Sequence, residues 1–507
     1  MLKNTFLSLS VAMLLFSCCE NNYNYLYTNL PFEMPVVQQP KFHSLTKSLT
    51  EYGGVGDGTT LNTDAFNQAM KDISEKGGGT LTVPFGVWFT GPIVFQSNIN
   101  LHLEKGALVL FSPDFDLYPL ITTNFEGLDT KRCQSPISGF NLENIAITGN
   151  GSFNGSGHAW RPLKKDKVTE GQWKRVVNGG GVVDAAGRIW YPSENAYNAI
   201  QLRSDMNVPQ EEMSDSAWLA IKDFLRPVML NFVSCKNVML QGVLFENSPA
   251  WCLHPLMCEN LIVDNITVRN PSWSQNGDGI DVESCKNVII VNSTFDVGDD
   301  AICIKSGKDK QGRERGIPTE NLLVDNCIVF NGHGGFVVGS EMSGGARNMK
   351  ITNCEFLGTD VGLRFKSRRG RGGVVENIYV ENISMFDIAT ESLLFDLFYG
   401  GTSAVEALDA GNDSPKAVEI PAVTDETPAF RNIYIKNMIS RNARRAMFFN
   451  GLPEMPITNI NIENSYVTAR IGAVLCEADG VKFTNVTVIP DSGEPIILQN
   501  VKNFENK

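Results

Sequence analysis

Two acidic segments lie close together in the chain and place carboxylates on the same local frame. NGDGIDVESC covers residues 276–285 and contains Asp278, whereas VGDDAICIKS covers residues 297–306 and contains Asp299 and Asp300. Asp278 and Asp300 both stand six residues before the serine that follows their strand. If the two strands stack in parallel, about 4.8 Å apart, these carboxylates meet. Clustered carboxylates repel one another, so one of them can hold a proton near neutral pH.

Two later segments, HGGFVVGS and DVGLRFKS, fit the same frame. In all four segments the positions four and two residues before the serine are apolar, and period-2 alternation sends them inward. The alternate positions then point outward. This alignment places His333 at the level of Asp299 and brings Arg364 and Lys366 from the following coil. We therefore expect three aspartates, one histidine, one arginine and one lysine to converge on one outer face.

A protonated carboxyl group beside ionised carboxylates suits the cleavage of a glycosidic bond. One acid protonates the leaving oxygen, and another carboxylate activates water or attacks the sugar. Residues 364–371 add five basic side chains to a protein of net charge −13, which suits the carboxylate of an anionic sugar. Two plainer interpretations are a solvated run of charge and acidic loops that bind calcium through oxygen ligands. The shared register favours a catalytic site over both.

A repeated frame of asparagine followed by alternating apolar residues predicts how these segments are positioned. Its leading asparagines are Asn237, Asn260, Asn287, Asn321, Asn348, Asn377, Asn432 and Asn459. Units of this size cannot bury their own apolar face, but stacked neighbours can, which predicts an all-β solenoid, a parallel β-helix. We expect the 55-residue step from Asn377 to Asn432 to combine two or three coils and to carry a polar insertion at about 401–428. Helical spacing within residues 63–74 predicts an N-terminal helical cap.

The four segments resemble the motifs of glycoside hydrolase family 28, the polygalacturonase family. The family's motifs stand here as Asn276-Gly277-Asp278, Gly298-Asp299-Asp300, Gly332-His333-Gly334 and Arg364-Phe365-Lys366, in the family's order. Gly277 and Phe365 depart from the commonest residues, and neither change removes a reactive group. The resemblance runs from about Tyr52 to the C-terminus. It implies a right-handed, single-stranded parallel β-helix of the pectin-lyase type.

The resemblance also implies an activity, the hydrolysis of α-1,4-galacturonosyl linkages in pectin with inversion. It implies that Asp299 is the general acid, that Asp278 and Asp300 position and deprotonate the water, and that His333 tunes the acid. It implies no metal and no cofactor.

The resemblance further implies which residues bind the substrate, an anionic pectic polysaccharide or oligogalacturonide. Arg364 and Lys366 would hold the galacturonate carboxylate, and Asn276 and Tyr399 would add substrate contacts. We expect no nucleic-acid partner for so acidic a chain, and we expect a monomer.

The N-terminus carries a targeting signal. Lys3 precedes an apolar run at about residues 6–16 that is too short to span a bilayer. Residues 15–18, LFSC, resemble a bacterial lipobox, so we expect a lipoprotein-type signal peptide at 1–18, lipidation at Cys18 and a tether at 19–45. Cys19 is the alternative lipidation site, and an ordinary signal peptide is the alternative signal. The β-helix domain would cover 46–505, exported and lipid-anchored in the bacterial envelope, periplasmic or at the cell surface.

Nine of the 11 cysteines remain when Cys18 and Cys19 are excluded, and their positions point to packing. Cys235, Cys258 and Cys285 recur in one local frame, which favours a stack of small buried residues over a disulfide framework.

An insertion at about 161–225 bears on the mode of cleavage. Together with the loop GKDKQGRERG at residues 307–316 it resembles the bacterial exo-acting members. We expect it to close one end of the cleft, so that the enzyme acts from the non-reducing end. The alternative is a structural elaboration far from the site.

Competing functions remain open from the sequence. One is a calcium-dependent pectate lyase on the same fold, and another is a hydrolase of galacturonosyl linkages in rhamnogalacturonan or pectin side branches. A third, of a different class, is a non-catalytic cell-surface glycan-binding β-helix.

Overall fold

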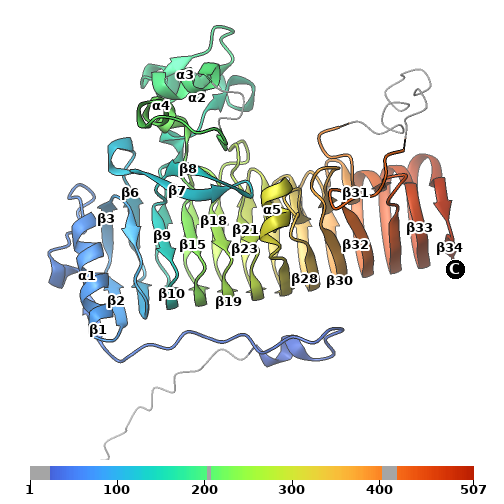
Figure 1. The fold of residues 1–507 in the computed structure, drawn as a ribbon, viewed down its shortest axis with the longest axis horizontal. Coiled ribbons are helices and arrows are strands. Elements are labelled where there is room, and N and C mark those ends of the chain that lie inside the picture. Colours follow the sequence, from blue (N-terminus) through green and yellow to red (C-terminus); the bar gives the residue numbers. More distant parts are fainter. Residues whose placement is uncertain (1–22, 203–206, 402–419) are drawn as a thin grey trace, which may run out of the picture.

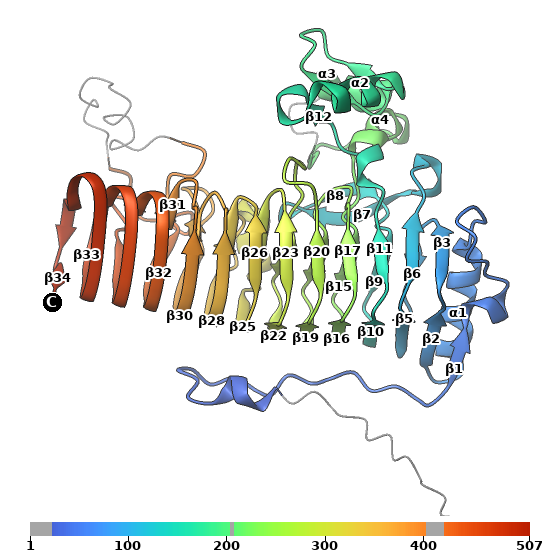
Figure 2. The same ribbon diagram turned by 180° about the vertical axis from the view of Figure 1, so that it is seen from behind.

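Short strands alternate with tight turns along the chain and stack into a right-handed parallel β-helix (Figure 1). The computed structural model describes residues 23–202, 207–401 and 420–507. Most coils contribute one strand to each of three stacks, and each strand pairs in parallel with its counterpart on the next coil. The solenoid predicted from the repeats is confirmed, and Figure 2 shows the same coils from behind.

The three stacks are defined by their strands. The site stack contains β4 (Ile93–Val94), β9 (Ile137–Phe140), β15 (Leu230–Val233), β18 (Leu253–Leu256), β21 (Ile280–Glu283), β24 (Asp300–Lys305), β27 (Gly334–Val338), β29 (Leu363–Lys366) and β31 (Glu391–Asp396). The back stack contains β1 (Thr46–Ser48), β2 (Gly79–Val83), β5 (Ile99–Leu103), β10 (Glu143–Gly149), β16 (Lys236–Gln241), β19 (Glu259–Asp264), β22 (Lys286–Val291) and β25 (Thr319–Asp325). The third stack contains β3 (Gly86–Thr90), β6 (Ala107–Phe111), β11 (Ser152–Asn154), β17 (Leu244–Glu246), β20 (Thr267–Arg269), β23 (Thr294–Val297) and β26 (Ile328–Asn331).

Towards the C-terminus the strands are longer and run through more than one stack. They are β28 (Ala346–Leu357), β30 (Val374–Phe386), β32 (Ala429–Asn450) and β33 (Ile457–Lys502), followed by β34 (Glu505–Asn506). Glu376 of β30 pairs directly with Arg431 of β32. The expectation that the 55-residue step combines two or three coils was therefore wrong. The step is one coil, and residues 402–419 of the predicted insertion at about 401–428 lie outside the described residues.

The repeated asparagines set the geometry of the back stack. All eight have φ between 53° and 60°, the left-handed region that asparagine adopts more readily than most residues. Each side-chain amide donates a hydrogen bond to the asparagine one coil earlier, at 2.8–3.5 Å, beginning with Asn237 on Asn144. The sequence repeat is thus one continuous ladder, and it fixes where each coil begins.

The interior is apolar, as the alternation predicts. The eight inward positions of the site segments are fully buried, namely Ile280, Val282, Ile302, Ile304, Phe336, Val338, Leu363 and Phe365. Cys235, Cys258 and Cys285 lie buried on successive coils, and all nine cysteines of the described chain are free thiols. Helix α1 (Thr63–Glu75) covers the N-terminal end of the coils (Figure 1) and buries Phe66, Met70 and Ile73.

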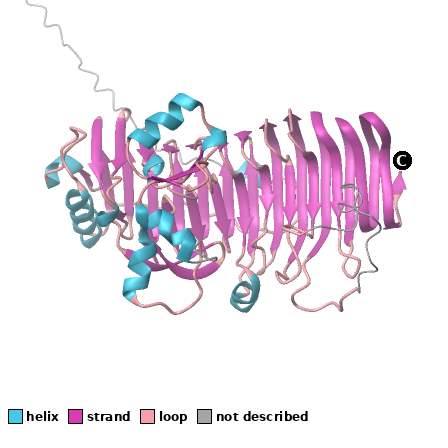
Figure 3. Cartoon of the chain, turned by 90° about the horizontal axis from the view of Figure 1, so that it is seen from above, coloured by secondary structure: helices cyan, strands magenta, loops and turns pink. Residues whose placement is uncertain are grey.

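Three additions rise around the site stack. A tower, residues 161–225, contains β12 (Leu163–Lys164), α2 (Glu170–Asn178), β13 (Val182–Val183), β14 (Ile189–Tyr191), α3 (Glu194–Leu202) and α4 (Asp215–Ile221). The antiparallel hairpin β7 (Leu120–Phe125) and β8 (Leu128–Cys133) lies at its base, and α5 (Asp309–Arg315) follows β24. Figure 3 shows the helices of the tower and α5 projecting from the coils.

Residues 23–45, within the segment predicted to be a tether, form a strap along the back stack, on the side opposite the tower (Figures 1 and 2). Tyr23 and Leu26 pack on outward-facing apolar residues that include Ile262 and Ile289. The Tyr23 hydroxyl donates to Asp264 at 3.0 Å. The described helices include none with the length and apolar character needed to cross a membrane. Cys18 and Cys19 lie outside the described residues.

The strap gives a first prediction. Leu26→Asp puts a charge at a buried strap position, and Leu26 burial stabilises docking by about 1.5–3 kcal/mol. We expect protease cleavage within residues 23–45 to become about 10–100 times faster, because local opening becomes easier, while the melting temperature of the β-helix stays unchanged.

The matched control is Val36→Asp, at a residue of the same segment that is 56% exposed. Equal cleavage rates for the two variants, measured by limited proteolysis with mass spectrometry, would contradict a docked strap.

Candidate active site

The register of the site stack brings distant residues to one place. Ile280 pairs with Ile302, which sets Asp278 one coil from Asp300. Asp300 pairs with Gly334, so Asp299 and His333 share a level. Val337 pairs with Arg364, which adds the cationic coil. The convergence predicted from the serine alignment is therefore present.

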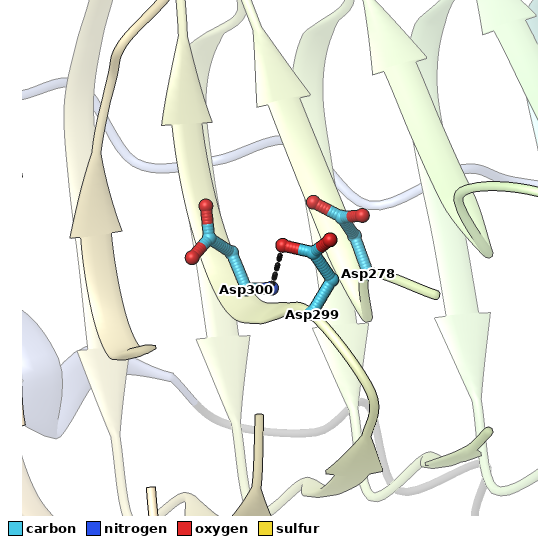
Figure 4. A group of neighbouring side chains, drawn as sticks. All are labelled: Asp278, Asp299 and Asp300. Carbon is cyan, nitrogen blue, oxygen red and sulfur yellow. Dashed lines mark hydrogen bonds between the residues drawn. The ribbon is translucent and has the colours of Figure 1, made fainter. Parts of the chain in front are cut away.

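Three carboxylates meet at the centre of this site. Asp278, Asp299 and Asp300 each offer an oxygen, and these oxygens lie within 4.8 Å of one another. Figure 4 shows the three side chains side by side, with the Asp299 carboxylate accepting a hydrogen bond from the backbone N–H of Asp300 at 3.0 Å. Asp278 and Asp300 are buried, and Asp299 is partly exposed. The group therefore has one member open to a ligand and two held in the protein.

Asp300 is held as an anion. The Lys366 ammonium donates to it at 2.7 Å and Arg364 donates at 3.3 Å. Burial by itself raises the pKa of Asp300, but the charges of Lys366 and Arg364, with that of Lys305, outweigh it and hold the pKa well below its usual range. Arg364 and Lys366 thus reach the predicted place, and both contact the Asp300 carboxylate.

Asp278 has the opposite environment. Burial raises the pKa of its carboxyl group well above the usual range, and the neighbouring charges of Asp299 and Asp281 raise it further. Its Oδ1 atom is buried without a hydrogen-bond partner among the described residues. Because the carboxylates interact strongly, the proton belongs to the cluster. A proton on Asp278 is within reach of Asp299.

His333 contacts the exposed side of the cluster. Its Nδ1 lies 3.0 Å from an Asp299 oxygen, and its backbone N–H donates to the Asp299 carbonyl at 3.0 Å. The hydrogen bond to Asp299 raises the pKa of the imidazole, although burial alone lowers it. Asp360 lies 3.8 Å from Nε2. The histidine therefore holds Asp299 from the side that faces solvent.

The cluster opens into a pocket of about 310 Å³. Its lining includes the three aspartates, Asn276, Lys366, Arg368, Arg371 and Tyr399. The Tyr399 ring lies 4.9 Å from the Lys366 ammonium and 5.7 Å from the Arg364 guanidinium. The Asn276 amide oxygen accepts a hydrogen bond at 2.8 Å from Arg226, the residue that directly follows the tower.

One end of the pocket is walled by elements far apart in sequence. Glu126, at the tip of the β7–β8 hairpin, lies 3.4 Å from Lys308, and both line the pocket. The Lys308 backbone N–H donates to the Gly127 carbonyl at 3.1 Å. The Gln311 side chain of α5 accepts a hydrogen bond from the Asp129 backbone N–H at 2.9 Å and donates one to the Gln210 side chain of the tower at 2.7 Å. Hairpin, α5 and tower thus contact one another beside the part of the pocket that Glu126 and Lys308 line.

Sequence reasoning missed the ion network under the pocket. Lys305 lies 2.9 Å from Glu341 and 3.6 Å from Asp281, and Glu341 lies 3.6 Å from Arg371. Lys305 stands one residue before the aligned serine Ser306, an outward position, so the alternation indicated that it could reach the site. Glu341 directly follows the aligned serine Ser340, outside the aligned positions. Glu126 belongs to the β7–β8 hairpin, and no local sequence pattern indicates that this hairpin folds over the site.

The three aspartates also have the oxygen spacing of a cation site. Asp300, however, already has two cationic partners, Lys366 and Arg364, and cationic Lys305 lies beside the cluster. The donor set therefore suits proton transfer better than the binding of a divalent ion.

Comparison with known proteins agrees with this site. The model for "Glycosyl hydrolases family 28" matches residues 172–435, about half of the chain. A probable polygalacturonase of Vitis vinifera is 28% identical over 467 residues, which cover 88% of this chain and 81% of that protein. The exo-poly-alpha-D-galacturonosidase of Dickeya chrysanthemi is 27% identical, over 69% of this chain and 57% of that protein.

A solved structure extends the likeness to the fold. The hyperthermoactive exopolygalacturonase of Thermotoga maritima aligns with a TM-score of 0.72 and 29% identity, over 91% of this chain and 95% of that one. With the stacked motifs in place, the chain belongs to glycosyl hydrolase family 28 and is a glycoside hydrolase of the polygalacturonase type.

Proposed function

We propose that this pectin-degrading hydrolase removes galacturonate units one at a time from the non-reducing end of the chain. The observation that carries the proposal is that the aspartate cluster and the ion pair of Glu126 with Lys308 line the same pocket. A chain end fits a pocket closed on one side, whereas an internal segment needs a cleft open at both ends. The relatives named exopolygalacturonase support the same mode.

In the proposed mechanism Asp299 protonates the glycosidic oxygen. It is the exposed member of the cluster, and His333 and the Asp300 N–H fix its carboxylate. Asp278 holds a proton close to it. Asp300, kept ionised by its two cations, accepts the proton of the attacking water.

We propose inversion at the anomeric carbon, supported by membership of the family. Inverting glycosidases usually separate their carboxyl groups by about 6.5–9.5 Å, but one oxygen of each aspartate here lies within 4.8 Å of the others. The proposal therefore rests on the family and not on this spacing. Proton NMR of the first-formed anomer tests it, and initial release of the retained anomer would contradict it.

The substrate carboxylate is proposed to bind at the cationic side of the pocket. Arg364 and Lys366 both form ion pairs with Asp300, at 3.3 Å and 2.7 Å. Arg368, which also lines the pocket, is exposed and has no ion pair within the described residues. Tyr399 forms the adjoining wall. We further propose export, lipidation at Cys18 and removal of the residues before it, on the sequence signal alone.

Asp299→Asn removes the proposed acid and keeps the shape of the side chain. We expect kcat on galacturonate oligomers to fall by about 10²–10⁴-fold, with unchanged circular dichroism. The matched control is Asp491→Asn, an exposed aspartate in the last coils, which should retain full activity. A loss of less than threefold for Asp299→Asn would remove Asp299 from the mechanism.

Early products distinguish an end-acting enzyme from an internal one. We expect digestion of homogalacturonan, in the presence of chelator, to release only monomeric galacturonate at first, as sized by anion-exchange chromatography. The double variant Glu126→Ala with Lys308→Ala weakens the wall and should add short oligomers to the products. Mixed oligomers from the wild type at the first time points would rule out the exo mode.

The electrostatics of Asp300 predict a pH effect. Asp300 acts as an anion, and its pKa is depressed, so activity should fall only when the pH drops well below the usual carboxyl range. Lys366→Met removes the nearest cation and should move the acid limb of kcat/KM to higher pH by about one unit, corresponding to about 1.4 kcal/mol. Lys366→Arg should keep the limb in place. An unmoved limb in Lys366→Met would show that Asp300 ionisation does not control the rate.

A further inference from the structure

The tower is divided into halves of opposite charge. Residues 161–191 contain seven lysines and arginines and three acidic residues, for a net charge of +4. Residues 192–225 contain two basic and six acidic residues, for a net charge of −4. The whole chain has a net charge of −13. We call residues 161–191 the basic lobe.

The charges of the basic lobe face solvent and are mostly uncompensated. Lys164, Lys165, Lys167, Lys174, Arg175 and Arg188 are all exposed. Lys174 pairs with Glu170 within α2 at 2.9 Å. The other five form no ion pair within the described residues. Cations left unpaired on an acidic protein give a local positive potential, which attracts anions over roughly a Debye length, about 8 Å at physiological salt.

The short sheet of the lobe gathers three of these cations. β12 pairs antiparallel with β14, with Lys164 opposite Ile189. Beside this pair lies a hollow of about 680 Å³, lined by Lys164, Lys165, Asp166, Arg188 and Ile189. Three basic residues against one acid, around an apolar floor, form a surface suited to a sugar chain that carries carboxylates.

The lobe also touches the loop that carries a catalytic-site aspartate. Its apolar core is Leu163, Trp173 and Trp190, and Trp273 packs against this core. Trp273 lies in the loop between β20 and β21, five residues before Asp278. The lobe therefore contacts the loop that leads to Asp278.

From this placement we propose that the basic lobe is a second binding surface for the anionic polysaccharide and holds the part of the chain that lies outside the pocket. The proposal rests on the proposed function for its substrate and adds a surface outside the reacting atoms. A polyanion approaching a protein of net charge −13 meets repulsion over most of the surface, and the lobe offers attraction beside the pocket. Long chains reach both surfaces, whereas a disaccharide fills the pocket alone.

The test is the triple variant Lys164→Gln, Lys165→Gln and Arg188→Gln. We expect KM for long homogalacturonan to rise about five- to tenfold at low salt, since each exposed charge contributes modestly, with kcat unchanged. KM for digalacturonate should stay within twofold of the wild type. High salt should raise KM for the polymer in the wild type and barely change it in the variant.

The matched control removes the same charge elsewhere. Lys41→Gln, Lys105→Gln and Lys502→Gln alter three exposed lysines outside the tower, and this variant should bind the polymer as the wild type does. An equal loss in both triple variants, or an equal rise of KM for digalacturonate and polymer, would overturn the proposal.

A binding measurement separates this proposal from the proposed function. Affinity electrophoresis with homogalacturonan in the gel, run on Asp299→Asn with and without the lobe changes, reports binding without cleavage. If the triple variant of the basic lobe is no longer retarded, the lobe binds the polymer, and this holds even if the wild type cleaves no galacturonan. Unchanged retardation, or lobe-dependent binding to phosphatidylglycerol vesicles with polymer binding intact, would assign the charge to something other than this polymer and overturn the proposal.

Discussion

The site depends on the fixed register between successive coils. Parallel strands lie about 4.8 Å apart, and the asparagine ladder fixes where each coil starts. A shift of one residue would send Asp300 inward and an apolar neighbour outward. The register instead sets Asp278 beside Asp300, and Asp299 beside His333. Four coils thus bring these side chains together through their register alone.

Close packing of charge then divides the carboxylates by role. Asp300 lies against Lys366 and Arg364, whose charges outweigh its burial and hold its pKa well below the usual range. Asp278 is buried with an oxygen that has no partner among the described residues, and burial raises its pKa well above the usual range. Two neighbouring groups with opposite pKa shifts are the expected signature of acid and base work. The ion network of Lys305, Glu341 and Arg371 lines the same pocket and adds further paired charges beside them.

What the sequence could predict follows the periodicity. The coils, the inward apolar positions, helix α1 and the convergence of Asp278, Asp299, Asp300, His333, Arg364 and Lys366 all follow from alternation and spacing, because stacking converts sequence frames into distances. The resemblance led us to expect that the insertion at 161–225 and the loop at 307–316 close one end of the cleft. The part played by the β7–β8 hairpin did not follow, since Glu126 meets Lys308 only through the folding of that hairpin. The expectation that two or three coils precede Asn432 was wrong, because the length of a sequence step does not distinguish an inserted loop from an additional coil.

The strap shows the same limit. Its Asn-, Tyr- and Pro-rich composition predicts a tether, yet Tyr23 and Leu26 contact outward apolar residues of the back stack. Ile262 and Ile289 are outward-facing apolar residues on strands whose inward face is also apolar. This pattern indicates that another segment covers the strands, but it does not indicate which one. The coverage becomes evident only when the whole stack is assembled.

The most direct test is a crystal structure of Asp299→Asn with a galacturonate trisaccharide. The account predicts the non-reducing sugar in the pocket against the Glu126–Lys308 wall, the first glycosidic oxygen within hydrogen-bond distance of residue 299, and the remaining sugars leading out of the pocket. A trisaccharide that passes the wall on both sides, or that binds with no glycosidic oxygen near residue 299, would contradict it.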